Sequence, residues 1–437
     1  MKKLSHQQHN SLPRPFDAVR WIGSLLLLVL SVLVPVRGFL VSPHHQHEGL
    51  AGTVRSSLGI TTSVAGALID RSRKRRRRTT TAPLGGTAMD DRATAATDFD
   101  VSPRPPTTLE AYEYDGWNLT YRTIANYDDD DDDDTGATGS IGDHHNVLLI
   151  HPVGIGLASW FWEPVLVALR DKTGSSTKTT TTTTTRAYAP NLIGCGISEG
   201  SDAWDPDERG LFVPLSWAKG CEALMNEIDD RDRDEGLENN NPSSSSSSLS
   251  RQRRWTIVTQ GGLAPVGVVL AARNPLSIRK LVLASPPTWE DMTVPVPVEE
   301  LERNYGFLRS KILGGLAFSL LETRKLVEFF SNLFLFTGEC DETWLDNTEK
   351  EFCKEARPPV QNFNAGMCMN RGFEKELTGD IREGIPSVVV VQGEGDKRQR
   401  GEYEENIGTN CKLVTLPGTN VVPWENPDSF ADLLLED

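Results

Sequence analysis

The stretch VTQGGLAPVGVVLAARNP, residues 258–275, carries the strongest signal of the fold. It begins inside WTIVT (255–259), a short uncharged run with several β-branched residues, which is typical of a buried strand. Gly261 and Gly262 then permit a sharp turn, and Ala264–Arg273 has the composition of a helix. A buried strand that turns directly into a helix predicts one unit of an α/β sheet.

Similar short apolar runs flank this unit along the chain, and segments of helical character separate them. They are NVLLI (146–150), a shorter run at 186–190, LVLAS (281–285), SVVVV (387–391) and KLVTL (412–416). Continuous apolar runs of this length indicate strands that are covered on both faces. We therefore expect an α/β fold with a mostly parallel central sheet and helices on both faces, preceded by a hairpin within residues 112–124.

Between Trp289 and Gly379 the pattern becomes helical and rich in phenylalanine. This block predicts an inserted helical cap, in which aromatic side chains serve packing more often than ligand contact. The expected organisation is a lead-in over 90–145, a first part of the core over 146–288, the cap over 289–380 and the last part of the core over 381–437.

Three low-complexity inserts interrupt this body. Asp128–Asp134 is a run of aspartates, residues 174–185 end in a run of threonines, and residues 229–254 mix charges with asparagine and serine. None of them has enough apolar side chains to build a core, so we expect solvated loops. The aspartate run offers no fixed ligand geometry, and no specific metal site is predicted there.

The first 89 residues differ from the rest of the chain in charge and composition. They hold 13 Lys/Arg and 3 Asp/Glu, a charge of +10; since the whole chain carries −16, the remaining residues carry −26. The uncharged run from Trp21 to Val36 suits the core of a signal peptide over 1–38. A disordered transit peptide is predicted over 39–89, because that stretch starts with Phe39, is rich in serine, threonine and arginine, and is poor in acids.

This two-part leader resembles the presequences of algae with secondary plastids, such as diatoms, and implies delivery to the plastid stroma. Two alternatives stay open. In the first, the apolar run is an uncleaved anchor that holds the protein in a membrane of the secretory pathway. In the second, RSRKRRRR (71–78) is a nuclear localisation signal. After removal of the leader, no stable membrane insertion is expected.

Composition excludes several classes of partner and cofactor. The acidic body argues against nucleic acid and anionic membrane surfaces. The six cysteines form no C-x-x-C pair and none stands beside a histidine, so neither a zinc site nor a disulfide framework is predicted. The glycine-rich turns lack the lysine of a P-loop and the full dinucleotide fingerprint. We therefore predict no cofactor and no metal.

Four landmarks follow one another from Asn146 to the C-terminus. They are IHPVGIGLASWFWEP from Ile150, APNLIGCGIS from Ala189, the unit at 258–275, and VVVVQGEGD ending at Asp396 paired with LPGTNVVPWENP from Leu416. In order and spacing they resemble the oxyanion loop, the Gly-rich loop, the nucleophile elbow, and the acid and histidine loops of the α/β-hydrolase superfamily. The resemblance implies the α/β-hydrolase fold with an inserted helical cap.

The same resemblance locates the residues that a Ser-His-Asp hydrolase needs, and two of them are missing. Aligned from the helix that follows, the G-x-S-x-G turn falls on residues 259–263, so Gly261 occupies the serine position. Asn420 occupies the histidine position, while Asp396 keeps the acid position. No histidine follows His151 in the chain, so the order Ser…Asp…His cannot be built even if the alignment slips by one residue.

The remaining candidate residues are expected around the same pocket. Val153 is the candidate backbone donor of the oxyanion loop. Gln260 and Asn420 offer donors and acceptors to a ligand but transfer no proton at neutral pH, and Gly262 is expected as a further oxyanion-like residue of the pocket. His151 is the one other candidate base, although a histidine at this place in the loop is usually structural.

The strings HPVGIGL, VTQGGLAPV and PGTNVVPWE resemble, more narrowly, a cyanobacterial and plastid branch of the AB hydrolase-1 type, which implies that the losses belong to a lineage. Three functions follow. The first is a plastid protein without serine-hydrolase activity that binds a small apolar ligand or a protein partner. The second is an enzyme of a non-serine mechanism that uses Asp396 and His151. The third is an esterase-like hydrolase whose site lies elsewhere, and the fold alone does not decide between them.

Overall fold

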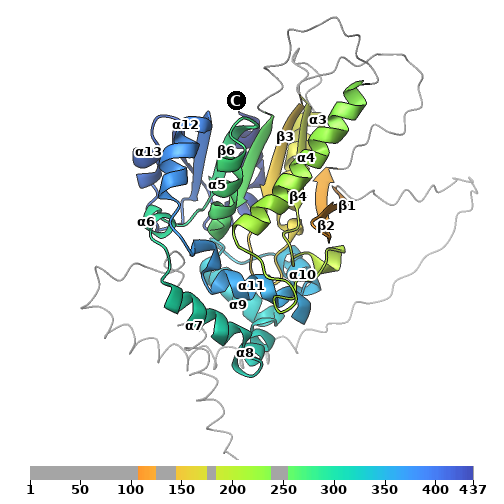
Figure 1. Cartoon of the computed structure of the whole chain (residues 1–437), viewed down its shortest axis with the longest axis vertical. Helices are drawn as coiled ribbons and strands as arrows, with labels where there is room; N and C mark the ends of the chain where they lie inside the picture. Colours follow the sequence, from red (N-terminus) through yellow and green to blue (C-terminus); the bar gives the residue numbers. More distant parts are fainter. Residues whose placement is uncertain (1–106, 125–143, 175–183, 238–253, 437) are drawn as a thin grey trace, which may run out of the picture. The chain divides into compact units, whose positions relative to one another are not determined.

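The computed structural model describes residues 107–124, 144–174, 184–237 and 254–436 (Figure 1). The leader predicted over 1–89 and the run Asp128–Asp134 lie outside these residues. Eight strands form one sheet in the order β1-β2-β4-β3-β5-β6-β7-β8. The strands are β1 (Thr107–Tyr114), β2 (Trp117–Ile124), β3 (His144–Ile150), β4 (Thr184–Pro190), β5 (Trp255–Gln260), β6 (Ile278–Ala284), β7 (Ser387–Gly393) and β8 (Cys411–Leu416).

The sheet is antiparallel at one edge and parallel elsewhere. β1 and β2 form a hairpin through Asp115 and Gly116, which have φ angles of 49° and 74°. A two-residue Asp-Gly turn with positive φ matches the twist of the strands that it joins. β2 then pairs antiparallel with β4, and the pairs from β4 through β8 are parallel. The predicted fold class, a mostly parallel α/β sheet, is confirmed.

Helices cover both faces of the sheet, as its continuous apolar strands require. One face packs against α4 (Leu215–Leu237) and α5 (Ala264–Arg273), and the other packs against α3 (Glu163–Gly174) and α15 (Pro427–Leu435). Neighbouring residues of a strand point to opposite faces of the sheet. Ile257 packs in the apolar core beside α4 and α5, and Val258 packs in the core beside α3 and α15. Two shorter helices, α13 (Glu402–Ile407) and α14 (Val422–Glu425), lie in the last part of the core.

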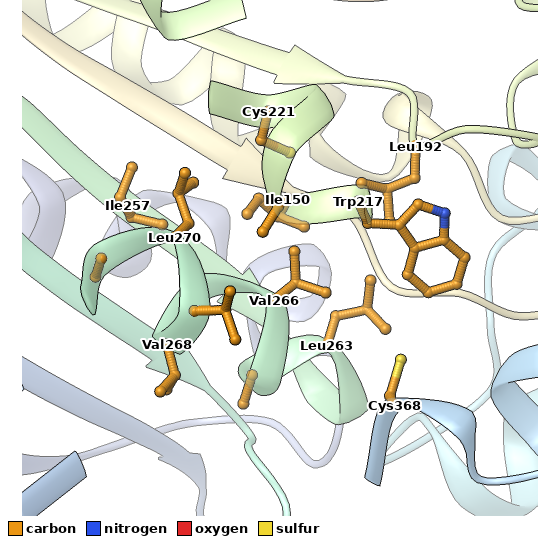
Figure 2. Packing of buried hydrophobic residues seen from close by; sticks show 14 of the residues in the cluster. Ile150, Leu192, Trp217, Cys221, Ile257, Leu263, Val266, Val268, Leu270 and Cys368 are labelled. Atoms are coloured by element: carbon orange, nitrogen blue, oxygen red, sulfur yellow. The ribbon is translucent and has the colours of Figure 1, made fainter. Parts of the chain in front are cut away.

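Helix α5 lies close against the sheet and fixes the turn that precedes it. Every residue from Ala264 to Ala271 is buried. Figure 2 shows Leu263 and Val266, at the start of this helix, among Ile150, Trp217 and Cys368. A Cβ added at Gly267 would lie 2.3 Å from Cγ2 of Thr259, so this glycine allows the helix to approach β5.

A block of helices between β6 and β7 forms the cap. Its members are α6 (Trp289–Thr293), α7 (Val298–Arg309), α8 (Leu313–Leu321), α9 (Arg324–Phe334), α10 (Glu342–Lys350) and α11 (Arg357–Asn364), followed by the π-helical turn η9 (Glu376–Ile381) and α12 (Arg382–Gly384). Helices α7 to α11 gather at one end of the sheet (Figure 1). Among the described helices, none is both long and apolar enough to cross a bilayer.

Three tryptophans join the cap to two distant parts of the core. Trp160 lies in the 3-10 turn η3 (Ser159–Trp162), Trp344 in α10 and Trp424 in α14. Their ring centroids are 5.3 to 5.4 Å apart in every pair, with edge-to-face geometry. All three rings are buried, and each indole N–H donates a hydrogen bond. The cluster therefore fixes the cap with both apolar area and directed contacts.

Part of a predicted loop is helical. Residues 229–254 were expected as a solvated insert, but α4 continues to Leu237. Two acidic residues in this part have long-range partners: Asp232 pairs with Arg186 at 2.6 Å and with Arg254 at 3.2 Å, and Asp229 accepts a hydrogen bond from the Trp255 indole. Likewise, residues 184 and 185 of the threonine run belong to β4. Composition alone did not reveal these long-range partners.

We predict that Trp344→Ala lowers the free energy of unfolding by about 3–5 kcal/mol, because it removes the shared member of a buried aromatic cluster. Chemical denaturation of the full chain measures this change. Phe212→Ala is the control, since Phe212 is 84% exposed and its loss should change stability by no more than about 0.5 kcal/mol. Equal effects of the two substitutions would contradict a structural role for the cluster.

Candidate functional site

The turn between β5 and α5 has the backbone of a nucleophile elbow without its side chain. Gly261 has a φ of 62°, a left-handed conformation that strains most residues other than glycine. A Cβ at Gly261 would find no atom within 4 Å, so there is open space where a serine side chain would stand. A Cβ at Gly262, in contrast, would lie 2.5 Å from Cζ of Phe363, on cap helix α11. The cap thus packs beside the elbow and leaves the nucleophile position open.

Gln260, the last residue of β5, ties the elbow to the predicted histidine loop. Its side chain is buried, and Nε2 donates a hydrogen bond to the backbone carbonyl of Asn420. Its other polar atom, Oε1, has no hydrogen-bond partner among the described residues. One buried acceptor at the elbow therefore remains for another group.

Asn420 holds the cap instead of serving as a base. Its backbone N–H donates to the carbonyl of Leu335 at 3.1 Å, and its Nδ2 donates to the carbonyl of Phe334 at the end of α9. Its Oδ1 accepts a hydrogen bond from Nη2 of Arg398. Both polar atoms of the Asn420 side chain are therefore engaged in hydrogen bonds. An amide also does not titrate near neutral pH, so it cannot act as a base.

Asp396, at the acid position, is enclosed by two arginines. Its carboxylate accepts from Arg398 Nε at 3.0 Å, from Arg398 Nη2 at 2.8 Å and from Arg400 Nη2 at 2.6 Å. Desolvation is the largest influence and raises the pKa, but the hydrogen bonds and charges of the two arginines together lower the pKa below its usual value. Asp396 is therefore ionised and paired, with Arg398 bridging it to Asn420.

The two arginines were missed by the sequence interpretation, although they stand two and four residues after Asp396 in KRQR (397–400). In sequence they read as a solvated charge run. In the structure Arg400 is fully buried, and Arg398 has a side chain only 18% exposed. The signal available in the sequence was a cluster of cations close to a residue that the family pattern places in a buried site.

His151 is fixed by hydrogen bonds at both ring nitrogens and is not joined to Asp396 by any hydrogen bond within the described residues. Nδ1 lies 2.8 Å from the carbonyl of Pro152, and Nε2 lies 3.2 Å from the backbone nitrogen of Leu192. Because a carbonyl only accepts and a backbone N–H only donates, the proton is on Nδ1. Complete burial lowers the pKa of His151 to about 4, so the ring is neutral at pH 7. Val153, on the same loop, is also buried.

Two glutamates that the sequence interpretation also missed fix the Gly-rich loop. Glu199 accepts from Oγ of Ser159 at 2.6 Å and from Nδ2 of Asn191 at 2.7 Å. Glu351, a buried residue of the cap, accepts a hydrogen bond from the hydroxyl of Ser198. Asn191 thus links the loop to the oxyanion segment, and Glu351 links it to the cap. No local sequence pattern predicts contacts between residues that are so far apart in the chain.

The described residues offer no metal or thiolate chemistry at this site. In the part of the chain that the structure describes, no group of three or more His, Cys, Asp or Glu side chains is arranged to hold a metal ion. Cys195 in the Gly-rich loop is buried, and desolvation together with the charge of Glu351 raises the pKa of its thiol. A buried neutral thiol is a weak nucleophile.

Comparison with known proteins settles the family. Residues 147–433 match the family model described as the alpha/beta hydrolase family. The chain belongs to the alpha/beta hydrolase family. This assignment confirms the superfamily expected from the sequence, while the AB hydrolase-1 type and the plastid branch remain predictions.

Among solved structures, the chain is similar to the haloalkane dehalogenase DbeA from Bradyrhizobium elkani, with 16% identity over 75% of this chain and 98% of that chain and a TM-score of 0.48. It is also similar to the epoxide hydrolase CorEH, with 15% identity over 75% and 97% of the two chains and a TM-score of 0.49. A third is Cfl2 from Burkholderia cenocepacia, with 16% identity over 76% and 96% and a TM-score of 0.47. No curated protein matches the sequence significantly.

The buried neutral state of His151 predicts a specific loss of stability in acid. From pH 6.5 down to about 4 the unfolded chain binds a proton at this residue and the folded chain does not. The free energy of unfolding should therefore fall with pH across this window, by roughly 3 kcal/mol in total for this one group. Urea denaturation at several pH values measures the fall, and His151→Gln should lack this component. Parallel pH profiles of the two proteins would show that His151 is not held neutral by burial.

Proposed function

We propose that this protein binds a small, largely apolar ligand at the elbow, under the cap, and has no serine-hydrolase activity. One observation carries the proposal: the elbow keeps its left-handed turn and open space at Gly261, but no side chain enters that space. A concave, mostly apolar site with a few fixed polar groups suits ligand binding without bond cleavage.

The other members of a catalytic triad are also committed to other contacts. A serine hydrolase needs a base that takes the proton of its nucleophile and an acid that orients that base. Here Asn420 contacts the cap, and Asp396 faces two arginines. A serine at position 261 would therefore find no base beside it.

The same contacts argue against an enzyme of a different mechanism that uses Asp396 and His151. A general base needs a free lone pair within reach of the substrate. The only lone pair of neutral His151 accepts the backbone N–H of Leu192, and the pKa of Asp396 is lowered by Arg398 and Arg400 despite desolvation, which acts the other way. Neither group is a poised proton acceptor near neutral pH.

The groups that remain around the elbow favour binding. Phe363 contributes an aromatic ring from the cap beside Gly262, and Gln260 contributes one buried acceptor without a partner among the described residues. Apolar walls give affinity, and a single fixed acceptor or donor gives orientation.

Native mass spectrometry of the purified full chain tests the proposed ligand binding by searching for a co-purified small molecule. An empty protein would favour a protein partner in place of a small ligand.

We predict that a serine-directed fluorophosphonate does not label the wild-type protein. Gly261→Ser should fold, because there is room for its side chain, and should label at most weakly, because no base is positioned. Gly315→Ser is the matched control, since that glycine also has open space around a Cβ but lies on α8, in the cap.

Two results would contradict the absence of serine-hydrolase activity. Rapid labelling of the wild-type protein would reveal a nucleophile elsewhere in the chain, as in the esterase-like alternative. Labelling of Gly261→Ser at the rate of an active hydrolase would reveal a base that the hydrogen bonds do not disclose. Esterase assays with short-chain acyl esters provide an independent readout of both variants.

We propose further that residues 1–89 direct the protein to a plastid, on the basis of the apolar run, Phe39 and the basic, acid-poor stretch that follows. A fluorescent protein fused after residue 89 should accumulate in the plastid of a diatom. Deletion of residues 1–38 should leave the fusion in the cytosol. Retention of the intact fusion at the endoplasmic reticulum would support the membrane-anchor alternative.

A further inference from the structure

The hairpin of β1 and β2 carries the one triplet in the sequence that matches N-x-S/T without proline in the middle, Asn118-Leu119-Thr120. This triplet is the acceptor sequence for an N-linked glycan. In the structure Asn118 is the second residue of β2 and directly follows the hairpin turn. It is exposed, whereas Leu119 and Thr120 are buried. The acceptor asparagine therefore lies at the surface of the folded protein.

The contacts of Asn118 are compatible with a sugar on its amide nitrogen. Nδ2 donates to Oδ2 of Asp202 at 3.3 Å, and the backbone N–H of Asn118 donates to the same oxygen at 2.8 Å. The backbone N–H of Asp202 donates in turn to the carbonyl of Asn118 at 2.9 Å, so two of the three contacts involve the backbone of Asn118 and not its side chain. An amide nitrogen that carries a sugar still keeps one of its two N–H groups. The folded structure can therefore accommodate a glycan without losing the contacts with Asp202.

The hydroxyl of Thr120, which completes the acceptor sequence, is enclosed in the folded protein. It lies 2.9 Å from Oγ of Ser201 and accepts a hydrogen bond from Nδ2 of Asn191 at 2.9 Å. β2 is also paired with β1 along its whole length. A transferase cannot reach this hydroxyl after folding, so it has to recognise the triplet before β2 joins the sheet. Ser201 stands 81 residues further along the chain, so the triplet emerges during synthesis well before this partner.

We propose that Asn118 accepts an N-linked oligosaccharide while the chain enters the endoplasmic reticulum, before β2 pairs with its neighbours. The inference rests on the proposed leader, because a signal peptide brings a chain to that membrane. The donor is an oligosaccharide linked through pyrophosphate to a membrane lipid. Nδ2 forms a bond to C1 of the first sugar, and the bond from C1 to the pyrophosphate oxygen breaks. The lipid pyrophosphate leaves with that electron pair, and a base of the transferase takes up the proton that Nδ2 loses.

Cell-free translation of the full chain with microsomes of the endoplasmic reticulum tests the site. The chain should gain mass on a denaturing gel, and peptide-N-glycosidase should remove the gain. Asn118→Gln and Thr120→Ala should each abolish the gain, whereas Thr120→Ser should keep it because the hydroxyl remains. The readout does not require these variants to fold, since the transfer precedes folding. Asn370→Gln is the matched control and should keep the gain, because Asn370 is also exposed but is followed by Arg371 and Gly372.

A second chain, in which an established signal peptide replaces residues 1–38, separates the glycan site from the leader. Protection from added protease reports entry of each chain into the microsomes. Protection of both chains without a gain in mass would overturn the glycan site and leave the leader standing; the triplet would then serve the contacts with Asp202 and Ser201 only. A gain in the second chain, with no protection of the first, would overturn the leader and with it the glycan of the native protein. A gain that Asn118→Gln does not remove would overturn the assignment to Asn118.

Discussion

A buried carboxylate must be neutralised, and the arginines that neutralise Asp396 connect its loop to two neighbouring loops at the carboxyl end of the sheet. Desolvation works against the charge, so the ionised state depends on Arg398 and Arg400. Arg398 passes the contact on to Asn420, and Asn420 holds the end of α9. The loop of Asp396, the loop of Asn420 and the cap are thereby joined in one hydrogen-bonded network.

The turn between β5 and α5 has the left-handed backbone of a nucleophile elbow, with glycine at its centre. A left-handed residue is costly for serine and easy for glycine, so Gly261 removes strain at the point where hydrolases accept it. The turn still has to form, because α5 approaches β5 closely at Gly267 and packs its buried face against the sheet. Packing therefore preserves the backbone at 261, whereas nothing in packing requires a hydroxyl there.

The cap is held by two kinds of interaction that serve different purposes. The tryptophans of the 160–344–424 cluster supply apolar area and a defined orientation, which are insensitive to salt and to modest changes of pH. The contacts of Glu351 with Ser198 and of Asn420 with Phe334 are polar and lie beside the site. The first kind fixes where the cap sits, and the second joins the cap to the loops around Ser198 and Asn420.

The amino-acid sequence by itself determined the fold class, since the apolar runs at 146–150, 255–259, 281–285 and 387–391 are strands of the parallel sheet. It also predicted a sharp turn at Gly261 between a strand and a helix, and the structure has this turn. The assignment of Gly261 and Asn420 to the serine and histidine positions stays a prediction. It did not reveal that residues 229–237 are helical, that Glu351 reaches Ser198, or that Arg400 is buried against Asp396. Periodicity and turn signals are local, so they can be read along the chain. The partners that neutralise a buried charge come from segments far apart in sequence or from residues that look solvated, and only the tertiary structure decides which of them meet.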